Sequence, residues 1–314
     1  RDPDKFYTIK IPKMTKHKLF PLFGFVAGII FTMLIFLSYT SKKSLTSFFE
    51  LPQQIKSVNL NKPFDFAGEP MPVNEDTRER LDRELSVNAY WQSTTLLHLK
   101  LANKYLPVVE RILAENGIPD DFKYLAIAES GLRNVTSSAS AKGYWQFMKP
   151  AATEMGLEIS EDVDERLHIE KSSKAACNYI KQLHRRFGNW TNVAGAYNVG
   201  PTAFARTLEE QKESNYYDVN INDETSRYLF RIIAIKEIVK NPHDFGYFVD
   251  DTEKYNLNPN LKTLSITSSI PSLADFAHQQ GITYRILKYY NPWLINNKLT
   301  VAPGKEYLIK VPQS

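Results

Sequence analysis

Cysteine, histidine and glycine are scarce in this chain of 314 residues, and their scarcity excludes several kinds of site. Cys177 is the one cysteine, so these residues form no internal disulfide and no multi-cysteine metal site. Its helical, apolar surroundings predict a buried core thiol. The six histidines show none of the spacings typical of zinc ligands, and no glycine pattern typical of phosphate or dinucleotide binding occurs. We therefore expect no metal and no other cofactor.

The charge is nearly balanced, with 39 Lys and Arg against 35 Asp and Glu, and no long basic run occurs. Because nucleic-acid-binding proteins cluster their basic residues, we do not predict nucleic acid as a partner. The formal charge of +4 suits a polyanionic polymer, or serves solubility alone. A content of 43% hydrophobic and 24% charged residues predicts a folded globular protein, and the length allows one sizeable domain and a small one.

One long apolar run stands near the start of the chain, because residues 19–39 contain no charged side chain. At 1.5 Å per residue such a helix reaches about 30 Å, the thickness of a bilayer core. A cleaved signal peptide would have a shorter apolar region and a small-x-small cleavage site, so we predict an uncleaved transmembrane anchor. Four lysines between residues 10 and 18 precede the run and two, Lys42 and Lys43, follow it, which predicts that residues 1–18 lie in the cytoplasm and the bulk of the chain outside, in the periplasm.

The remaining sequence divides into four parts by composition. Residues 40–76 are rich in Ser, Asn, Lys and Pro and are predicted to form a stalk. Apolar residues at helical spacing then predict a mainly α domain over 77–245, followed by a linker over 246–260. The last part, 261–314, alternates like strands at 261–267 and 307–311, with two short helical segments between them, and is predicted to be a small βααβ module.

The helical domain is organised around residues 122–132, an apolar run in which Glu129 is the one acid. Asp120 and Asp121 stand at the expected N-cap, and Gly131 stands where the helix is expected to end. Glu129 therefore projects from the last turn beside small and apolar neighbours, a setting that disfavours ionisation. A carboxyl kept protonated near neutral pH can serve as a general acid for glycoside cleavage. The alternative is a capping or solvated glutamate.

Two further segments carry polar side chains suited to binding sugars. In Gly143-Tyr144-Trp145-Gln146-Phe147-Met148, the glycine allows close approach of a ligand and Gln146 offers an amide to hydroxyl or acetamido groups. Trp145 offers an apolar face for a sugar ring or else belongs to the core, and we assign Phe147 and Met148 to the core. In Ala196-Tyr197-Asn198-Val199-Gly200, Tyr197 can hydrogen-bond near the acid and Asn198 can fix polar groups.

The order Glu-Ser, Gly-x-x-Gln-x-Met, Ala-Tyr-Asn-x-Gly and a late tyrosine resembles the catalytic domain of the soluble lytic transglycosylase family. The resemblance covers roughly residues 100–245 and implies a goose-type-lysozyme-like fold with peptidoglycan glycan strands as substrate. It implies Glu129 as the catalytic residue. The implied substrate-binding residues are Ser138, Ser140, Gln146, Tyr197, Asn198 and Tyr228.

By the same resemblance, Glu129 protonates the glycosidic oxygen between N-acetylmuramic acid and N-acetylglucosamine. It then acts as base on the muramyl C6 hydroxyl, which closes onto C1 to give a 1,6-anhydro product. An ordinary glycosidase needs a second carboxyl group, but Glu154, Glu158 and Asp162 stand in polar settings that predict solvated side chains. The alternatives are a muramidase that uses water and a wall-binding scaffold without activity.

The βααβ module resembles a LysM module, which binds N-acetylglucosamine chains. The usual Gly-Asp-Thr-Leu opening is replaced by residues 268–273, Ser-Ser-Ile-Pro-Ser-Leu. Two interpretations therefore stay open for 261–314: a glycan-binding module, and a structural appendage that packs on the catalytic domain. The sequence names no protein partner.

Overall fold

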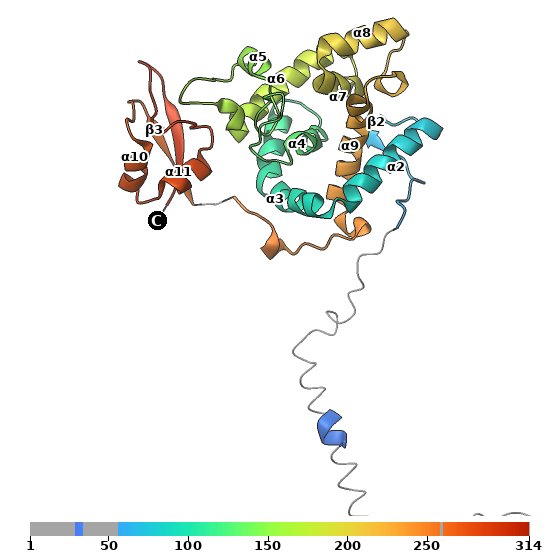
Figure 1. Ribbon diagram of the computed structural model, residues 1–314, viewed down its shortest axis with the longest axis horizontal. Helices are drawn as coiled ribbons and strands as arrows, with labels where there is room; N and C mark the ends of the chain where they lie inside the picture. The colour runs from blue at the N-terminus through green and yellow to red at the C-terminus, as the bar shows by residue number, and fades with distance from the viewer. Residues whose placement is uncertain (1–28, 34–55, 258–259, 314) are drawn as a thin grey trace, which may run out of the picture. The chain divides into compact units, whose positions relative to one another are not determined.

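The structure is a computed structural model that describes residues 29–33, 56–257 and 260–313 (Figure 1). Most of the predicted anchor 19–39 and all of residues 1–18 lie outside these ranges, and both stay predictions. Residues 29–33 are helical, and no helix within the described ranges is long and apolar enough to cross a membrane. The chain divides into two compact units, 1–55 and 56–314, and the second is described below.

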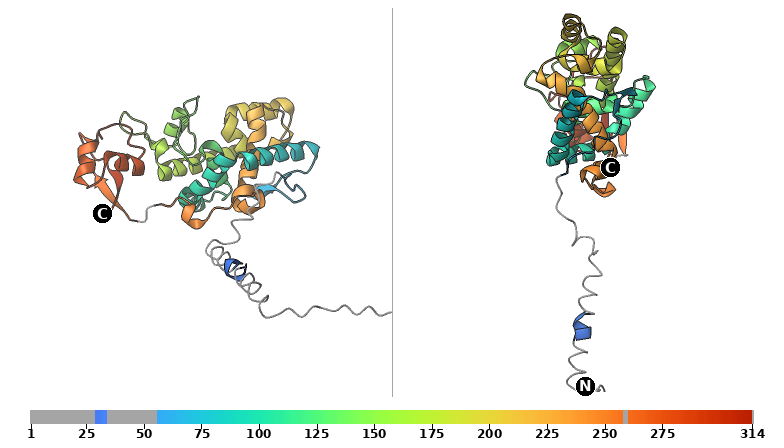
Figure 2. Two further views of the ribbon diagram at one scale, coloured as in Figure 1. Left: turned by 60° about the horizontal axis from the view of Figure 1, so that its bottom comes forward. Right: turned by 90° about the vertical axis from the view of Figure 1, so that its right-hand side faces the viewer.

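Helices dominate residues 75–240, as the helical periodicity predicts. Figure 1 shows α4 in the middle of a ring formed by α2, α3, α6, α7 and α9, and Figure 2 again shows α2 beside α9, which it contacts. The helices are α2 (Glu75–Tyr90), α3 (Gln92–Glu115), α4 (Phe122–Ser130), α5 (Lys149–Glu154), α6 (Ile169–Phe187), α7 (Trp190–Val199), α8 (Pro201–Gln211) and α9 (Asp223–Lys240).

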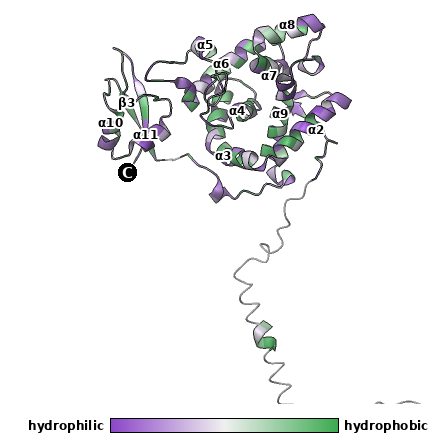
Figure 3. Cartoon of the chain, viewed as in Figure 1, coloured by the Kyte–Doolittle hydropathy of each residue, from purple (hydrophilic) through white to green (hydrophobic). Residues whose placement is uncertain are grey.

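The central helix α4 is the most buried element of this domain. Its side chains Phe122, Leu125 and Ala126 are fully buried and pack against α3 and α9. Figure 3 shows hydrophobic residues gathered on the helices around α4 and hydrophilic residues at the outer end of α8. Because burying one large apolar side chain contributes about 1.5–3 kcal/mol, α4 is held by packing far more than by its own nine residues of helix propensity.

The ends of α4 follow different rules. Gly131 ends the helix with φ +59°, as predicted, and a Cβ there would lie 2.7 Å from His98 Nε2. Asp121 occupies the N-cap position, as predicted, but its side chain makes no capping hydrogen bond in α4. The carboxylate instead accepts hydrogen bonds from the ammonium of Lys236 on α9 and the backbone amide of Ala67, both at 2.7 Å. A charge-assisted bond to a nearly buried lysine outcompetes a local cap.

A short hairpin, β1 (Asp65–Phe66) with β2 (Glu69–Pro70), lies within the segment predicted as a stalk. Phe64, Phe66 and Met71 are buried in the main core, so the stalk does not extend to residue 76. The hairpin also supports α7, since the Glu69 carboxylate accepts hydrogen bonds from the amides of Trp190 and Thr191 at 2.7 and 2.9 Å. A carboxylate at this position satisfies the unpaired amides of a helix N-terminus.

The C-terminal module has the predicted βααβ order. Its strands pair antiparallel, and its core includes Leu273, Leu287 and Ile309. The elements are β3 (Leu261–Ile266), α10 (Leu273–Gln279), α11 (Tyr284–Tyr290) and β4 (Tyr307–Pro312).

A loop of the helical domain completes this small core. Val163 is fully buried among the module's apolar residues and forms a β-bridge with Leu294. The prediction that Asp162 is solvated is wrong. Its side chain is buried, and its two oxygens accept hydrogen bonds from Asn296 Nδ2 at 2.8 Å and the Thr300 amide at 2.9 Å.

The other two carboxyls considered as second acids differ in their exposure to solvent. Glu158 is partly buried and accepts hydrogen bonds from the Tyr307 hydroxyl at 2.8 Å and the Lys305 ammonium, so its predicted solvation is also wrong. Glu154 is exposed, as predicted. Neither Glu158 nor Asp162 is available for chemistry beside Glu129, because both tie the module to the helical domain.

Candidate active site

Glu129 lies in the last turn of α4, and Tyr228 of α9 reaches it. The Tyr228 hydroxyl donates a hydrogen bond to Glu129 Oε1, and the tyrosine side chain is almost fully buried. Glu129 itself is partly exposed, whereas its neighbour Ser130 is buried and donates hydrogen bonds to Ala126 O and Tyr144 O. The carboxyl is thus held by buried groups and still reachable from outside.

The pKa of Glu129 is raised from its ordinary value of 4.5 to about 7. Burial is the main cause, because removing water penalises the charged form. The hydrogen bond from Tyr228 and the charge of Arg231 act in the opposite direction, and the charge of Glu224 adds to the rise. Close to half of the Glu129 carboxyls are therefore protonated at neutral pH, as a general acid requires.

Tyr197 of α7 joins this pair, as the sequence predicts. Burial, followed by the charge of Glu129, raises the pKa of the Tyr197 hydroxyl well above its ordinary value, so it stays protonated. The hydroxyl donates a hydrogen bond to Trp145 O at 2.8 Å. This contact fixes the segment 143–146 against α7, and it leaves Tyr197 partly exposed.

Gln146 is partly exposed and has φ +49°, which is unusual for a residue with a side chain. Its amide nitrogen donates to Gly143 O at 2.8 Å and to Val135 O at 3.1 Å, so the amide group is fixed in one orientation. Within the described residues its amide oxygen has no protein donor. A fixed acceptor of this kind can bind a hydroxyl or an acetamido N–H of a sugar.

In the described part of the chain, the other predicted site residues make no hydrogen bond to the acid. Asn198 Oδ1 accepts a hydrogen bond from Thr225 Oγ1 at 2.8 Å, so it joins the end of α7 to the start of α9. Ser138 and Ser140 are exposed on the loop before residue 143, and neither side chain hydrogen-bonds to Glu129, Tyr197 or Tyr228 in the described part of the chain.

The structure decides between the two alternatives for Trp145 and contradicts one expectation. Trp145 is fully buried and its indole nitrogen donates to Ser173 Oγ at 2.9 Å, so it belongs to the core and offers no face to a sugar. Phe147 is buried as expected, but the expectation that Met148 belongs to the core is wrong, because its side chain is 45% exposed. The direction of a side chain in an irregular segment is not set by any periodicity, which explains this error.

Sequence reasoning missed the charged residues that surround the acid. Arg231 lies one helix turn after Tyr228 and pairs with Glu224 at 2.9 Å and with the buried Glu84 at 3.5 Å. The i, i+3 spacing from Tyr228 was a signal that could have found Arg231. Glu224 gave no such signal, because its effect on Glu129 depends on how α9 packs against α4.

Cys177 is buried, and burial raises the pKa of its thiol to about 11, which agrees with the predicted core thiol. Across residues 29–33, 56–257 and 260–313, no group of three or more His, Cys, Asp or Glu side chains could hold a metal ion.

Comparison with known domain families gives two matches. The Transglycosylase SLT domain matches residues 109–220, which contain Glu129, Gln146, Tyr197 and Asn198. The Soluble lytic transglycosylase C-terminal LysM-like domain matches residues 262–314. Tyr228 lies just beyond the first match.

Two curated proteins are similar to the chain. Membrane-bound lytic murein transglycosylase D of Escherichia coli strain K12 is 25% identical over 245 residues, which is 76% of this chain and 52% of that protein. A putative tributyltin chloride resistance protein of Alteromonas sp. strain M-1 is 26% identical over 125 residues, or 39% of this chain and 60% of that protein. The chain thus spans about half the length of the first relative.

Several solved structures resemble parts of the chain, among them two lytic transglycosylases. The 70 kDa soluble lytic transglycosylase of Escherichia coli aligns with a TM-score of 0.40 and 19% identity over 58% of this chain and 32% of that one. An inactive mutant of the lytic transglycosylase Slt of Pseudomonas aeruginosa aligns with a TM-score of 0.34 and 18% identity over 48% and 26%.

The mainly helical domain contains the first family match and the small βααβ module corresponds to the second, in the same order along the chain. The chain therefore contains a transglycosylase SLT domain followed by a LysM-like domain of the soluble lytic transglycosylase type.

Proposed function

We propose that this chain is a lytic transglycosylase that cleaves murein between N-acetylmuramic acid and N-acetylglucosamine and leaves a 1,6-anhydro end. The SLT match and the similarity to a lytic murein transglycosylase support the activity. The observation that carries the mechanism is Glu129, a carboxyl with a pKa of about 7 that is bound by the Tyr228 hydroxyl.

Glu129 serves first as acid and then as base. Its proton goes to the glycosidic oxygen as the C1–O bond breaks, and the resulting carboxylate takes the proton of the muramyl C6 hydroxyl as O6 bonds to C1. Tyr228 holds the carboxylate in this second stage through its hydrogen bond. The attacking hydroxyl belongs to the same sugar, so its high effective concentration replaces a positioned water and a second carboxylate.

The remaining polar groups bind the glycan. Tyr197, which is close enough for the charge of Glu129 to raise its pKa, offers a hydroxyl, and Gln146 offers a fixed amide. Ser138 and Ser140 offer exposed hydroxyls on the adjoining loop. Asn198 acts on the site through Thr225. The LysM-like module adds glycan contacts, and the apolar run 19–39 anchors the chain in the cytoplasmic membrane with the catalytic domain outside; the similar protein's name, membrane-bound, supports this location.

Digestion of purified sacculi tests the reaction. The full chain in detergent is expected to release fragments with 1,6-anhydromuramic ends, recognised by mass spectrometry as lacking one water, and Glu129→Gln is expected to lower the rate at least a thousandfold because it has no proton to give. Fragments with ordinary reducing ends would instead assign the chain to the muramidases. A parent chain that binds sacculi but releases no fragments would favour the wall-binding scaffold without activity.

One observation keeps the hydrolytic alternative in view, namely the electrostatic effect of Glu224 on Glu129. Glu224 pairs with Arg231 and is largely exposed, so we assign it no part in bond breaking. In a lytic transglycosylase, Glu224→Gln is expected to retain activity within about tenfold and to lower the pKa of Glu129 slightly. A muramidase that used Glu224 as its second carboxyl would lose activity as fully as Glu129→Gln does.

A further inference from the structure

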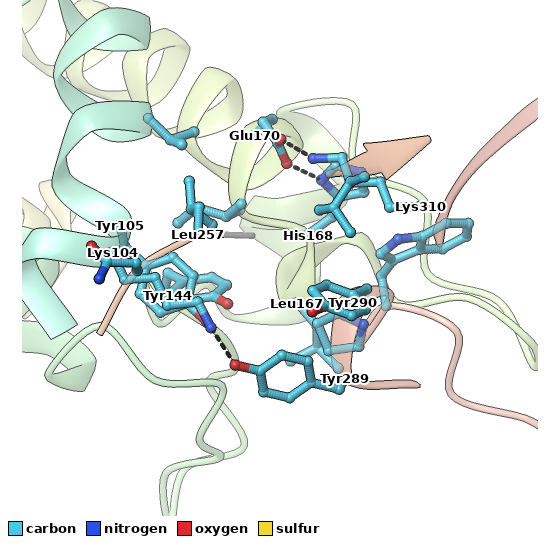
Figure 4. Close-up of a pocket in the computed structure, with 16 residues that line it drawn as sticks. Lys104, Tyr105, Tyr144, Leu167, His168, Glu170, Leu257, Tyr289, Tyr290 and Lys310 are labelled. Atoms are coloured by element: carbon cyan, nitrogen blue, oxygen red, sulfur yellow. Dashed lines mark hydrogen bonds and ion pairs between the residues drawn. The ribbon is translucent and has the colours of Figure 1, made fainter. Parts of the chain in front are cut away.

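A second cavity, of about 450 Å³, lies away from Glu129 (Figure 4). Its volume falls in the range of small-ligand pockets. It is lined by α3, by the segment that precedes α6 and by the C-terminal module, and none of Glu129, Gln146, Tyr197 or Tyr228 lines it. The charged and aromatic lining residues used below are Lys104, Tyr105, Glu170, Tyr289, Tyr290 and Lys310.

One ion pair in this pocket is complete. The carboxylate of Glu170 binds the ammonium of Lys310 and lies 3.1 Å from His168 Nδ1, and dashed lines in Figure 4 mark both contacts. Although burial opposes it, these two partners hold the pKa of Glu170 well below its usual range. Lys310 and Glu170 therefore cancel each other's charge.

Lys104 is different, because no carboxylate in the described part of the chain lies within ion-pair distance of its ammonium. The residue is only 9% exposed. The ammonium donates a hydrogen bond to the Tyr289 hydroxyl at 2.7 Å and lies over the rings of Tyr105 and Tyr289, at 5.0 and 4.5 Å from their centres. Burial is the largest single influence on the pKa of Lys104 and would lower it. The hydrogen bond to Tyr289 and the electrostatic effects of the Tyr105 and Tyr289 hydroxyls together outweigh burial, so the pKa is raised.

A buried cation without a counter-charge costs free energy, and such sites are usually completed by an anion. The three donors of the ammonium are not exhausted by one hydroxyl. A carboxylate on a ligand would supply the missing charge and would make a charge-assisted hydrogen bond. Lys104 thus specifies the chemistry of one end of the ligand.

The tyrosines of the pocket indicate the chemistry of the rest of the ligand. Tyr289 is 59% exposed, Tyr105 is partly exposed, and Tyr290 stands edge-on to Tyr289. Ring faces with a hydroxyl at the edge suit sugars, whose C–H faces pack on the ring and whose hydroxyls bind at its rim. Trp293 takes no part in such stacking, because it is buried against Tyr307 and His168.

We propose that this pocket binds a carboxylate-bearing amino sugar of the glycan, with Lys104 on the carboxylate and Tyr289 under the sugar. The proposal rests on the proposed function for its choice of polymer. The carboxylate can come from the lactyl group of muramic acid or from an attached peptide. The pocket shares the segment 143–146 with the active site, since Tyr144 lines it while Tyr197 binds Trp145 O.

Binding is measured on the full chain in detergent carrying Glu129→Gln, which prevents turnover. Three soluble probes separate the sources: chitobiose without a carboxylate, N-acetylglucosaminyl-N-acetylmuramic acid with the lactyl carboxylate, and the same disaccharide carrying a peptide. Hydrogen exchange followed by mass spectrometry locates each probe. With one or both carboxylate probes, we expect protection from hydrogen exchange over residues 100–108 and 284–293. Protection over 122–146, in the candidate active site, is scored separately.

Lys104→Gln is expected to weaken binding of the carboxylate probes at this pocket about tenfold and to leave chitobiose unaffected. Lys104→Arg keeps the charge and restores binding, which separates lost recognition from lost folding. The matched control is Lys174→Gln, an exposed lysine on α6. Unchanged affinity in Lys104→Gln, or protection confined to 122–146, overturns the proposal. Digestion of sacculi with Glu129 intact is scored separately, so a failed pocket and a failed enzymatic function give different results.

Discussion

The side chain of Glu129 is subject to opposing influences, and their balance sets the pH at which it works. Burial raises its pKa to about 7, while the Tyr228 hydrogen bond and Arg231 hold it down. The acid must start protonated, so kcat/KM is expected to fall as pH rises through about 7, by tenfold for each further pH unit.

Tyr228→Phe tests this balance. Removing the hydrogen bond that favours the carboxylate raises the pKa of Glu129 further, so the alkaline limb of the pH profile is expected to move to higher pH. The maximal rate is expected to fall by about 10²- to 10⁴-fold because the carboxylate loses its orientation. The check is a profile of sacculus digestion from pH 4 to 9. A limb that moved to lower pH would contradict the assignment of Tyr228 as donor.

The same raised pKa carries a cost in stability. A carboxyl whose pKa rises on folding stabilises the folded state fully below its ordinary pKa of 4.5, and this contribution is lost as pH rises through about 7. Glu129→Gln removes the cost. Urea unfolding is therefore expected to show the variant gaining up to about 3 kcal/mol on the parent between pH 4.5 and pH 8. A gain that did not grow with pH would contradict the buried acid.

At this scale the sequence was informative where a residue sits on a helix. Periodicity predicts the face of the helix on which Glu129 lies, and the family resemblance implies Tyr228. The alternatives for Trp145 stayed open and Met148 was assigned wrongly, because the segment between Gly143 and Lys149 has no period. Lys104 had no sequence signal, since its environment is completed by Tyr289, far along the chain.

At the scale of elements, the turn at Gly143 determines whether the segment 143–146 can take its place beside the candidate active site. Gly143 has φ +81°, and a Cβ there would lie 1.9 Å from the carbonyl oxygen of Arg166. Gly143→Ala is expected to destabilise the fold by about 3 kcal/mol or more, because backbone on both sides must move. Gly156→Ala is the matched control, since Gly156 has φ +85° with nothing within 4 Å of the added carbon.

Chemical denaturation of both variants measures the difference. Gly156→Ala is expected to cost only the strain of a left-handed backbone, about 1–2 kcal/mol. Equal losses in the two variants would show that the contact with Arg166 matters little.

Helices were predictable, and their starts were less so. The apolar spacing within 77–245 does not mark where α6 starts, at Ile169, after a short 3-10 turn, Glu165–Leu167. The Asp164 carboxylate binds the Arg166 side chain at 2.7 and 2.9 Å, and the Glu165 side chain accepts from the Glu158 amide. These contacts hold residues 164–166 outside the helix, and helical periodicity does not predict them.

At the scale of the whole molecule, the domain and the module share a core. Val163 of the helical domain is fully buried in the module. Val163→Ala is expected to destabilise the module by about 1–2 kcal/mol through lost packing. Limited proteolysis is expected to cut residues 246–260 or the module faster than in the parent, whereas Val73→Ala, at a 70% exposed position, should cut at the parental rate. Equal cutting of both variants would mean that the module is independent.

The order of the parts was predicted from composition, but their limits were not. Pro and Asn are frequent before residue 76, which is typical of a linker, yet Phe64, Phe66 and Met71 are buried. The alternation of Phe64 and Phe66 was the signal for a strand. The contacts of Asp162 and Glu158 with the module could not be predicted, because they depend on a fold that brings distant segments together.

The hairpin of residues 65–70 is fastened at two points, to Lys236 and Asp121 at the base of α4 and to the first amides of α7 through Glu69. Upstream of the hairpin, Lys56 is hydrogen-bonded to Tyr90 of α2 and Lys62 pairs with Glu237 of α9. A mechanical load on the N-terminal segment would therefore pass first through α2 and α9, and then through the hairpin to α4 and α7.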